Sequence, residues 1–406
     1  MPTPTTSGRD LGLARMVFVA MMAFWLLYPL LEQGQYAQDA IPLVVAGELA
    51  HQHPDIIYVR PGGGLFDTQP EFFAASCKYY DNPTDCDHFV VAFVSPPPAL
   101  PLVVPLSKLG DDAFIVVREL AAVALVAAMV LLWRRLTPLA PRSAWSLAIA
   151  AALLTPLMTA PIGLGQSSPL LFLAAALPLT AMSRPGWRSA VFGVLMALVG
   201  ALKAFPFALL AIPFVKRKWP PVAWAVGLFA LLSVVALTIA PLDLWHTFVS
   251  RSGGLSRESS HNPYNSSLEA ALGQIGIHAA VFAWIVRAIL AVPIFMVAKR
   301  VRDTDVWWAC SWAVMLVLFP QVWGHYSFVT VAAMAAVLVW RSDRERWLWS
   351  LPACAALTVP IGILGGHSSG SPMVQLLCNL VALALVVGIA AQPMTSEPVP
   401  APASAA

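Results

Sequence analysis

The stretch Gln35-Tyr36-Ala37-Gln38-Asp39-Ala40 opens a long polar loop, residues 32–112, directly after an apolar segment, residues 13–31. The apolar segment has about the length of a membrane-spanning helix. It carries no cleavage site of small residues, which argues against a removed signal peptide. The loop is acidic, aromatic and rich in proline, so we expect it to carry the chemistry. A helix-like run, residues 41–51, follows Asp39, and we expect it to lie at the membrane interface.

The composition is that of a polytopic membrane protein. Hydrophobic residues make up 59% of the chain and charged residues only 11%, whereas soluble domains contain about 25% charged residues. Apolar stretches of about 17–25 residues recur along the chain, each long enough to cross a bilayer. We therefore expect an all-α fold with about twelve transmembrane segments. The sequence has no Walker motif and no basic stripe, which argues against an ATP-driven pump and against nucleic-acid binding.

The distribution of charge predicts the topology. Six short clusters hold 16 of the 24 lysine and arginine residues, and the loops between them hold all eight histidines and most acidic residues. Cytoplasmic loops are rich in Lys and Arg, so we place the clusters in the cytoplasm and residues 32–112 outside. Residues 242–278 form a second expected outer loop. We predict one transmembrane domain, residues 13–391, between disordered ends, residues 1–12 and 392–406.

One apolar segment has an unusual length. Only 27 residues separate Arg188 from Lys216, and both ends carry cytoplasmic charge. The segment is too short for two spans, so we predict two half-length helices meeting near residues 201–206, where Lys203 lies. A buried ammonium group is costly and tends to be functional, and a lipid phosphate would suit it. Snorkelling is the alternative for Lys203. Arg287 is a second candidate for the phosphate, with a structural ion pair as its alternative.

Asp39 is the candidate general base. Transfer of a group from a phosphate to an acceptor hydroxyl requires that hydroxyl to lose its proton, and a carboxylate within hydrogen-bond reach can take it. The alternative is that Asp39 caps the helix that follows it, because aspartate is a favoured N-cap residue.

Several uncharged or imidazole side chains are further candidates. His325 lies between aromatic residues near a helix end, and it either binds phosphate or sugar or has a structural role. Three residues suit sugar hydroxyls and equally suit helix capping: Gln166, Tyr264 and Asn265.

The first outer loop also contains two cysteines and a short histidine cluster. Cys77 and Cys86 face an oxidising compartment in this topology, so we predict a disulfide, with free thiols as the alternative. A zinc site is disfavoured because no second pair has ligand spacing. The spacing of His51, His53 and Asp55 matches no strong metal motif. We expect neither a metal nor a cofactor.

Motifs in the outer loop resemble glycosyltransferase family 87, within the GT-C superfamily. Asp39 is followed by Ala46-Gly47 and then by Asp55-Ile56-Ile57-Tyr58, similar to the family's aspartate, Ala-Gly and terminal Tyr pattern. Ser95-Pro96-Pro97-Pro98 stands where the family usually has Tyr-Pro-Pro.

Two further motifs extend the resemblance. Gly165-Gln166-Ser167-Ser168-Pro169, followed by the lysine-bearing residues 200–206, resembles the family's Gly-Gln-x-Asn and Lys-Pro-like elements. Trp323-Gly324-His325-Tyr326 resembles Trp-Asp-His-His. The departures at Ser168, Gly324 and Tyr326 leave open which sugar is transferred.

The resemblance implies a GT-C fold and a specific reaction. A polyprenyl-phosphate sugar, mannose or arabinofuranose, would be the donor, and a periplasmic glycan, glycolipid or protein the acceptor. Asp39 would be the base, His325 would lie near the donor phosphate, and Tyr58 would join the candidates for sugar or acceptor binding. The protein would lie in the bacterial inner membrane with its site facing the periplasm. A transporter or flippase of a lipid-linked sugar is the alternative, and the long outer loop with its acidic residue disfavours it.

Overall fold

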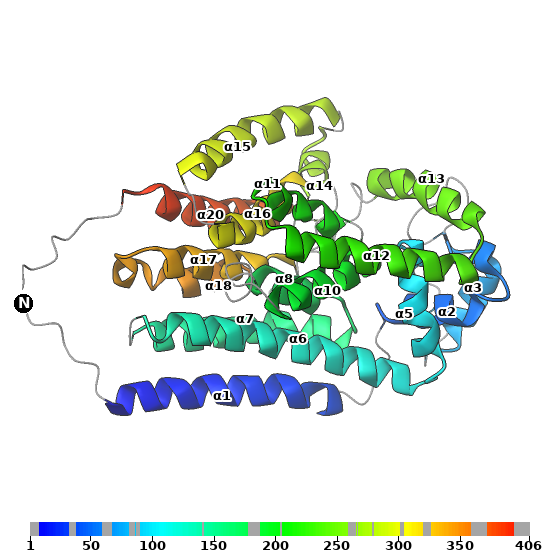
Figure 1. Ribbon diagram of the computed structural model, residues 1–406, viewed down its shortest axis with the longest axis horizontal. Coiled ribbons are helices and arrows are strands. Elements are labelled where there is room, and N and C mark those ends of the chain that lie inside the picture. The colour runs from blue at the N-terminus through cyan, green and yellow to red at the C-terminus, as the bar shows by residue number, and fades with distance from the viewer. Residues whose placement is uncertain are drawn as a thin grey trace, which may run out of the picture.

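The computed structural model describes residues 8–31, 38–58, 67–80, 86, 90–139, 142–177, 187–203, 205–258, 265, 267–277, 280–300, 304–319, 326–358 and 372–393. Within these residues every regular element is a helix (Figure 1), which confirms the all-α prediction. Four described helices are long and apolar enough to cross a membrane: α1 (Gly8–Leu31), α6 (Asp112–Leu136), α12 (Trp219–Ile239) and α20 (Pro372–Ala391). The larger number of spans, about twelve, stays a prediction.

Helix α17 (Val329–Trp340) forms the centre of the bundle. All residues from Val329 to Leu338 are buried, as expected for a helix that is apolar on every side. Four alanines in this run leave room for close helix–helix approach. Helices α6 and α20 contact α17, as do three shorter helices: α8 (Ser168–Ala176), α16 (Thr304–Leu318) and α18 (Ser350–Thr358).

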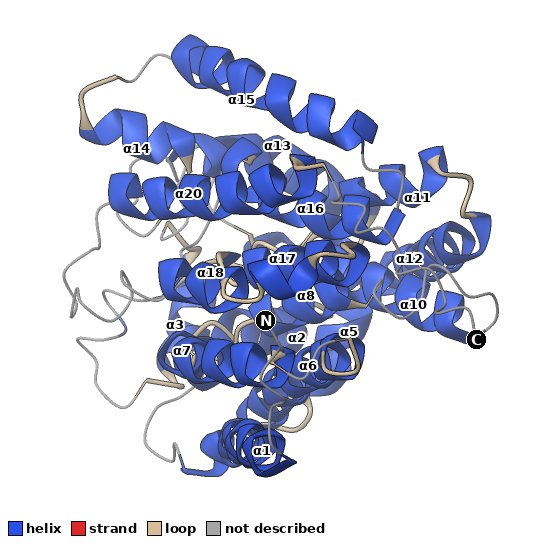
Figure 2. Ribbon diagram, turned by 90° about the vertical axis from the view of Figure 1, so that its left-hand side faces the viewer, coloured by secondary structure: helices blue, strands red, loops and turns tan. Residues whose placement is uncertain are grey.

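Helix α1 lies at one edge of the bundle and α15 (Ala280–Arg300) at the opposite edge (Figures 1 and 2). The Trp25 indole on α1 donates a hydrogen bond of 3.1 Å to Thr155 on α7 (Ser143–Gly163) and joins these two helices. Helix α1 begins at Gly8, so the predicted disorder of residues 1–12 is wrong for residues 8–12. Asp10 in the first turn favours helix there, because it complements the helix dipole.

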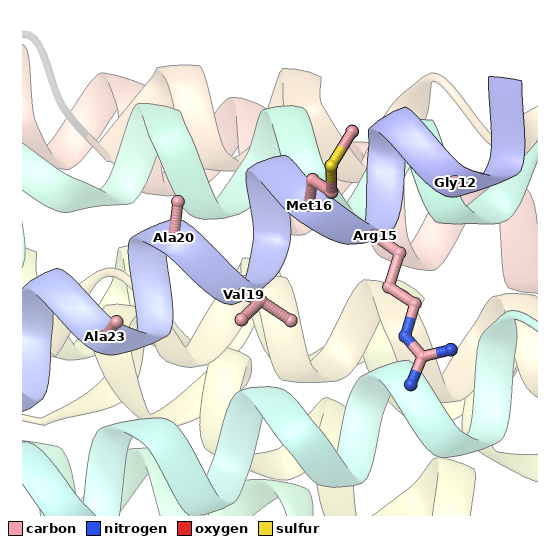
Figure 3. A pocket seen from close by; sticks show the side chains of 6 residues that line it. All are labelled: Gly12, Arg15, Met16, Val19, Ala20 and Ala23. Carbon is pink, nitrogen blue, oxygen red and sulfur yellow. The ribbon is translucent and has the colours of Figure 1, made fainter. Parts of the chain in front are cut away.

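A shallow depression on the surface of α1 is separate from the candidate chemistry (Figure 3). It lies between Gly12 and Ala23, toward the N-terminal end of α1, whereas Asp39 follows the C-terminal end of that helix. Exposed apolar side chains such as Met16 border it, as expected where a helix faces lipid tails. One helix supplies all six lining residues: Gly12, Arg15, Met16, Val19, Ala20 and Ala23.

Short helices from residues 32–112, the predicted first outer loop, gather at one end of the bundle (Figure 1). They are α2 (Ile41–Leu49), η1 (Pro54–Ile56), α3 (Pro70–Cys77), η2 (Pro97–Ala99) and α5 (Leu100–Ser107). Helix α2 confirms the helix predicted after Asp39. These elements share a hydrophobic core distinct from that of the bundle. A Cβ atom at Gly47 would lie 2.4 Å from the Val103 carbonyl oxygen, so Gly47 allows α2 to contact α5 at backbone distance.

These short helices and the segments between them, which we call the outer layer, include the predicted cysteine pair. Cys77 at the end of α3 is bonded to Cys86, with their Cα atoms 5.3 Å apart. The nearby Tyr79 hydroxyl donates a hydrogen bond to Glu48 on α2. Together these contacts connect the segment after α3 to the rest of the outer layer.

The predicted second outer loop contains two helices that the sequence did not indicate to us. Residues 242–278 contain α13 (Leu242–Glu258) and α14 (Leu268–Gln274). Ser267 is the N-cap of α14, and its hydroxyl accepts a hydrogen bond of 3.3 Å from the Ala270 backbone N–H. Glu269 in the first turn complements the helix dipole. These two features could have predicted the start of α14.

The segment with unusual length is interrupted at Lys203. Helix α10 (Trp187–Leu202) ends just before it, and two short helices follow: η3 (Phe205–Leu210) and α11 (Ala211–Val215). Pro206 lacks the backbone N–H that a continuous helix would need. The predicted break is therefore present, and it places Lys203 between helices.

Arg341 ties α17 to α20 at the other end of α17. Its guanidinium group is fully buried and donates two hydrogen bonds to Asp343, at 2.6 and 2.8 Å. It also donates to the carbonyl oxygens of Ile389 and Gln392 at the C-terminal end of α20. A cation in this position complements the negative end of the helix dipole.

Candidate active site

The site begins with the turn between α7 and α8. The Gln166 N–H donates to the Pro161 carbonyl oxygen at 2.8 Å, and the Gly165 N–H donates to that of Ile162 at 3.1 Å. Gly165 has a φ of +67°. Together with the left-handed conformation of Gly165, these two bonds form the Schellman motif that ends many helices. It fixes the position of Gln166 directly after the helix end.

Asp39 is attached to this turn by backbone and side chain. Its N–H donates a 3.0 Å hydrogen bond to the Leu164 carbonyl oxygen. The Gln166 side-chain amide donates to the Asp39 carboxylate. Ser168 in turn donates to the Gln166 amide oxygen at 3.2 Å, which fixes the orientation of that amide. The N-cap position of α2 is Ala40, with no side-chain cap bond. Asp39 therefore does not cap α2, contrary to the alternative considered from the sequence.

The Asp39 carboxylate is accessible and also surrounded by protein. The residue keeps exposed surface, yet desolvation by the surrounding protein raises the pKa of its carboxyl group. The Gln166 hydrogen bond and the charge of Lys203 act in the opposite direction. Such a carboxylate can be reached by a substrate and is a stronger base than a free one, as general-base catalysis requires.

Lys203 is the charged side chain that acts on Asp39. Its ammonium group donates a hydrogen bond to the Tyr326 hydroxyl and lies 4.6 Å from the centre of the Tyr326 ring. The positive charge is within electrostatic range of the Asp39 carboxylate. Within the described part of the chain, no direct ion pair joins Lys203 to Asp39. The site thus contains a carboxylate and an ammonium group that are near each other but held by different partners.

Arg118 on α6 supports the same turn. Its side chain is 5% exposed, and its Nε atom donates a 2.7 Å hydrogen bond to the Gly163 carbonyl oxygen. The next carbonyl group along the chain, that of Leu164, accepts from the Asp39 backbone. Arg118 was not among the site residues predicted from the sequence. An arginine within an apolar helix was the available signal.

The other described candidates lie in separate surroundings. The buried Tyr58 hydroxyl donates to the Ser95 carbonyl oxygen at 3.0 Å and so connects two parts of the outer loop. Asn265 accepts a 3.1 Å hydrogen bond from the Ser267 N–H, just before α14. Arg287 on α15 forms an ion pair with Glu269 on α14, which is the alternative considered for it. Within the described part of the chain, these hydrogen bonds and this ion pair connect the three side chains to residues other than Asp39 and Lys203.

Two candidates, Tyr264 and His325, lie outside the described residues. Among the described residues, no group of three or more His, Cys, Asp or Glu side chains is arranged to hold a metal ion.

The fold and the site together define a multi-pass, helical membrane protein with a carboxylate and an ammonium group at one end of its bundle. The family model of glycosyltransferase family 87 matches residues 93–320, more than half of the chain. The chain belongs to this family and is a glycosyltransferase. The matched region includes Arg118, Gln166 and Lys203, while Asp39 precedes it and Tyr326 follows it. No curated protein and no solved structure matches the chain.

Proposed function

We propose that the protein is an inverting glycosyltransferase that takes a monosaccharide, mannose or arabinofuranose, from a polyprenyl phosphate. The acceptor is a glycan, glycolipid or protein on the periplasmic side of the bacterial inner membrane. The observation that supports this proposal most is the position of Asp39. Its carboxylate is held by Gln166 and lies within electrostatic range of Lys203.

In the proposed reaction, Asp39 takes the proton of the acceptor hydroxyl as its oxygen attacks the anomeric carbon. The bond between that carbon and the phosphate oxygen breaks, and polyprenyl phosphate leaves with the electron pair. Attack from the face opposite the phosphate inverts the configuration. Lys203 stabilises the charge that develops on the phosphate, and its low-dielectric surroundings strengthen this effect. His325 remains a candidate second donor to the phosphate.

Arg287 contributes less to this proposal than its sequence position suggested. Arg287 is 5% exposed and its guanidinium group is paired with Glu269, so its charge is already compensated. Gln166, in contrast, gains a clearer role than sugar binding, because its amide donates to the proposed base. It orients the carboxylate whether or not it also contacts a sugar hydroxyl.

The test is transfer from defined donors. Purified protein in lipid nanodiscs would be incubated with polyprenyl-phosphate mannose or arabinofuranose and an acceptor extract, and released polyprenyl phosphate and glycosylated product measured by mass spectrometry. Asp39→Asn should reduce release by at least about a hundredfold, because a positioned base contributes that much.

Asp243→Asn is the matched control: Asp243 is an exposed acid on α13 in the second outer loop, and its replacement should leave turnover unchanged. Undiminished release by Asp39→Asn would contradict the assignment of the base. Movement of intact sugar-lipid across a vesicle without release would indicate a transporter.

A further inference from the structure

The Lys203 ammonium group is held by a partner that the proposed reaction does not use. Tyr326 accepts its hydrogen bond, and the ring of the same residue lies within cation–π distance, 4.6 Å from Nζ to the ring centre. Tyr326 is 4% exposed, and its hydroxyl is also within electrostatic range of Asp39. Asp39, Lys203 and Tyr326 therefore form one electrostatic unit, with Gln166 as the neutral partner of the carboxylate.

The position of Tyr326 is fixed from two helices. The next residue, Ser327, is fully buried, and its hydroxyl accepts a 2.9 Å hydrogen bond from the Gln375 amide on α20. Thr330 on α17 donates to the Ser327 carbonyl oxygen at 2.7 Å. These bonds hold Ser327 in place. The neighbouring Tyr326 side chain therefore has little freedom to move away from Lys203.

The electrostatics explain why such a partner is needed. An ammonium group and a carboxylate in the same low-dielectric surroundings attract each other strongly. A direct ion pair would occupy a carboxylate oxygen that the acceptor hydroxyl needs, and it would make Asp39 a weaker base. Yet no direct ion pair joins the two within the described residues, and the ammonium group is hydrogen-bonded to Tyr326 instead.

From this geometry we infer that Tyr326 is a positioning residue that keeps the Lys203 ammonium group beside Asp39 without pairing to it. The inference rests on the proposed function, in which Asp39 is the base and Lys203 meets the donor phosphate. Tyr326 acts through Lys203, and both the availability of the carboxylate and the placement of the cation depend on it.

The test is Tyr326→Phe, which removes the hydroxyl and keeps the ring. Lys203 then loses its neutral acceptor and moves onto Asp39, so kcat/KM should fall about tenfold to a hundredfold, as for loss of a hydrogen bond to a charged group. The acidic limb of the pH profile of kcat/KM should move to lower pH, because an ion-paired carboxylate protonates at lower pH. A loss of packing alone would lower the melting temperature and leave that limb in place.

Tyr79→Phe is the matched control. It also removes a buried tyrosine hydroxyl bonded to a charged side chain, that of Glu48, but in the outer layer. Its pH profile should equal that of the wild type. A wild-type pH profile and kcat/KM for Tyr326→Phe would overturn the positioning role, even where Asp39→Asn is inactive. Full activity of Asp39→Asn would instead overturn the proposed function itself, so the two failures are distinguishable.

A double-mutant cycle separates action through Lys203 from an independent effect of Tyr326. Binding of a polyprenyl phosphate to protein in nanodiscs serves as the readout, because it does not require turnover. Tyr326→Phe should weaken binding in the wild-type background and change it less than about twofold in a Lys203→Gln background. Equal weakening in both backgrounds would contradict action through Lys203.

Discussion

At the scale of single residues, the environment of Asp39 predicts the pH dependence of transfer. The base must be deprotonated to act, so activity is present above its pKa and is lost as the pH falls through that value. Desolvation raises this pKa above the ordinary value of 3.8. We therefore expect the acidic limb of kcat/KM to lie above that of a free carboxyl group. Gln166→Leu should move the limb to still higher pH, since it removes a hydrogen bond that favours the charged form.

The measurement is kcat/KM for release of polyprenyl phosphate over the acidic range. Gln274→Leu is the control, because Gln274 lies at the end of α14 and its amide oxygen accepts from the Met373 N–H. Its limb should coincide with that of the wild type. A limb for Gln166→Leu at lower pH than the wild type would contradict the role assigned to this amide.

The sequence predicted some of these residues and missed others for a physical reason. Asp39 and Lys203 were recognisable because a charged side chain beside or within an apolar helix raises the free energy of the protein in the membrane. Such residues are usually functional. The hydrogen bond from Gln166 to Asp39 joins residues 127 positions apart, and the bond from Lys203 to Tyr326 joins residues 123 apart. No local pattern encodes such pairings. Arg287 is also a basic residue in an apolar segment, as Lys203 is. Its partner, however, is Glu269 on a neighbouring helix, which gives it a structural ion pair.

At the scale of elements, the end of α7 is where local sequence most directly determines the site. Gly165 adopts a left-handed backbone conformation, with φ at +67°, which costs a residue with a side chain about 1–2 kcal/mol. Gly165→Ala should lower the melting temperature. It should also reduce kcat/KM at least about tenfold, because Gln166 and the Leu164 carbonyl group both shift relative to Asp39.

Gly163→Ala provides a closely matched control two residues earlier. A Cβ atom there would make only ordinary contact with the Tyr28 ring, at 3.7 Å. Gly163 is the last residue of α7 and has no positive φ, so its backbone conformation is open to alanine. This variant should keep both activity and melting temperature. Equal loss in the two variants would show that the backbone conformation at Gly165 is not the cause.

The elements themselves were predicted unevenly. Helix α2 and the break at Lys203 followed from apolar patterning, proline and charge, which act over a few residues. Helices α13 and α14 were predicted as loop, because their segment is more polar than a membrane span. The close contact of α2 with α5 at Gly47 depends on tertiary packing. The sequence shows the glycine, but it does not show that the Val103 backbone lies against it.

At the scale of the whole molecule, opposite ends of the bundle carry different kinds of interaction. One end holds Asp39, Lys203 and the outer layer with its own hydrophobic core. At the other end of α17, Arg341 and Asp343 fasten α17 to the C-terminal end of α20. The central helix is therefore anchored at both ends, through Ser327 and Gln375 near the site and through Arg341 away from it. This arrangement holds Tyr326 at a defined position relative to the bundle.

The orientation of the bundle in the membrane is a prediction that helix α6, which connects the two ends, allows us to test. Lys108 is exposed just before α6 in the outer layer, and Arg134 is exposed in the last turn of α6, within a basic cluster. Basic clusters mark the cytoplasmic side. In a background with Cys310, Cys354 and Cys378 replaced by serine, Lys108→Cys should react with a membrane-impermeant maleimide in intact spheroplasts. Arg134→Cys should react only after permeabilisation. The reverse pattern would place Asp39 on the cytoplasmic side, where a donor and acceptor of the periplasm could not reach it.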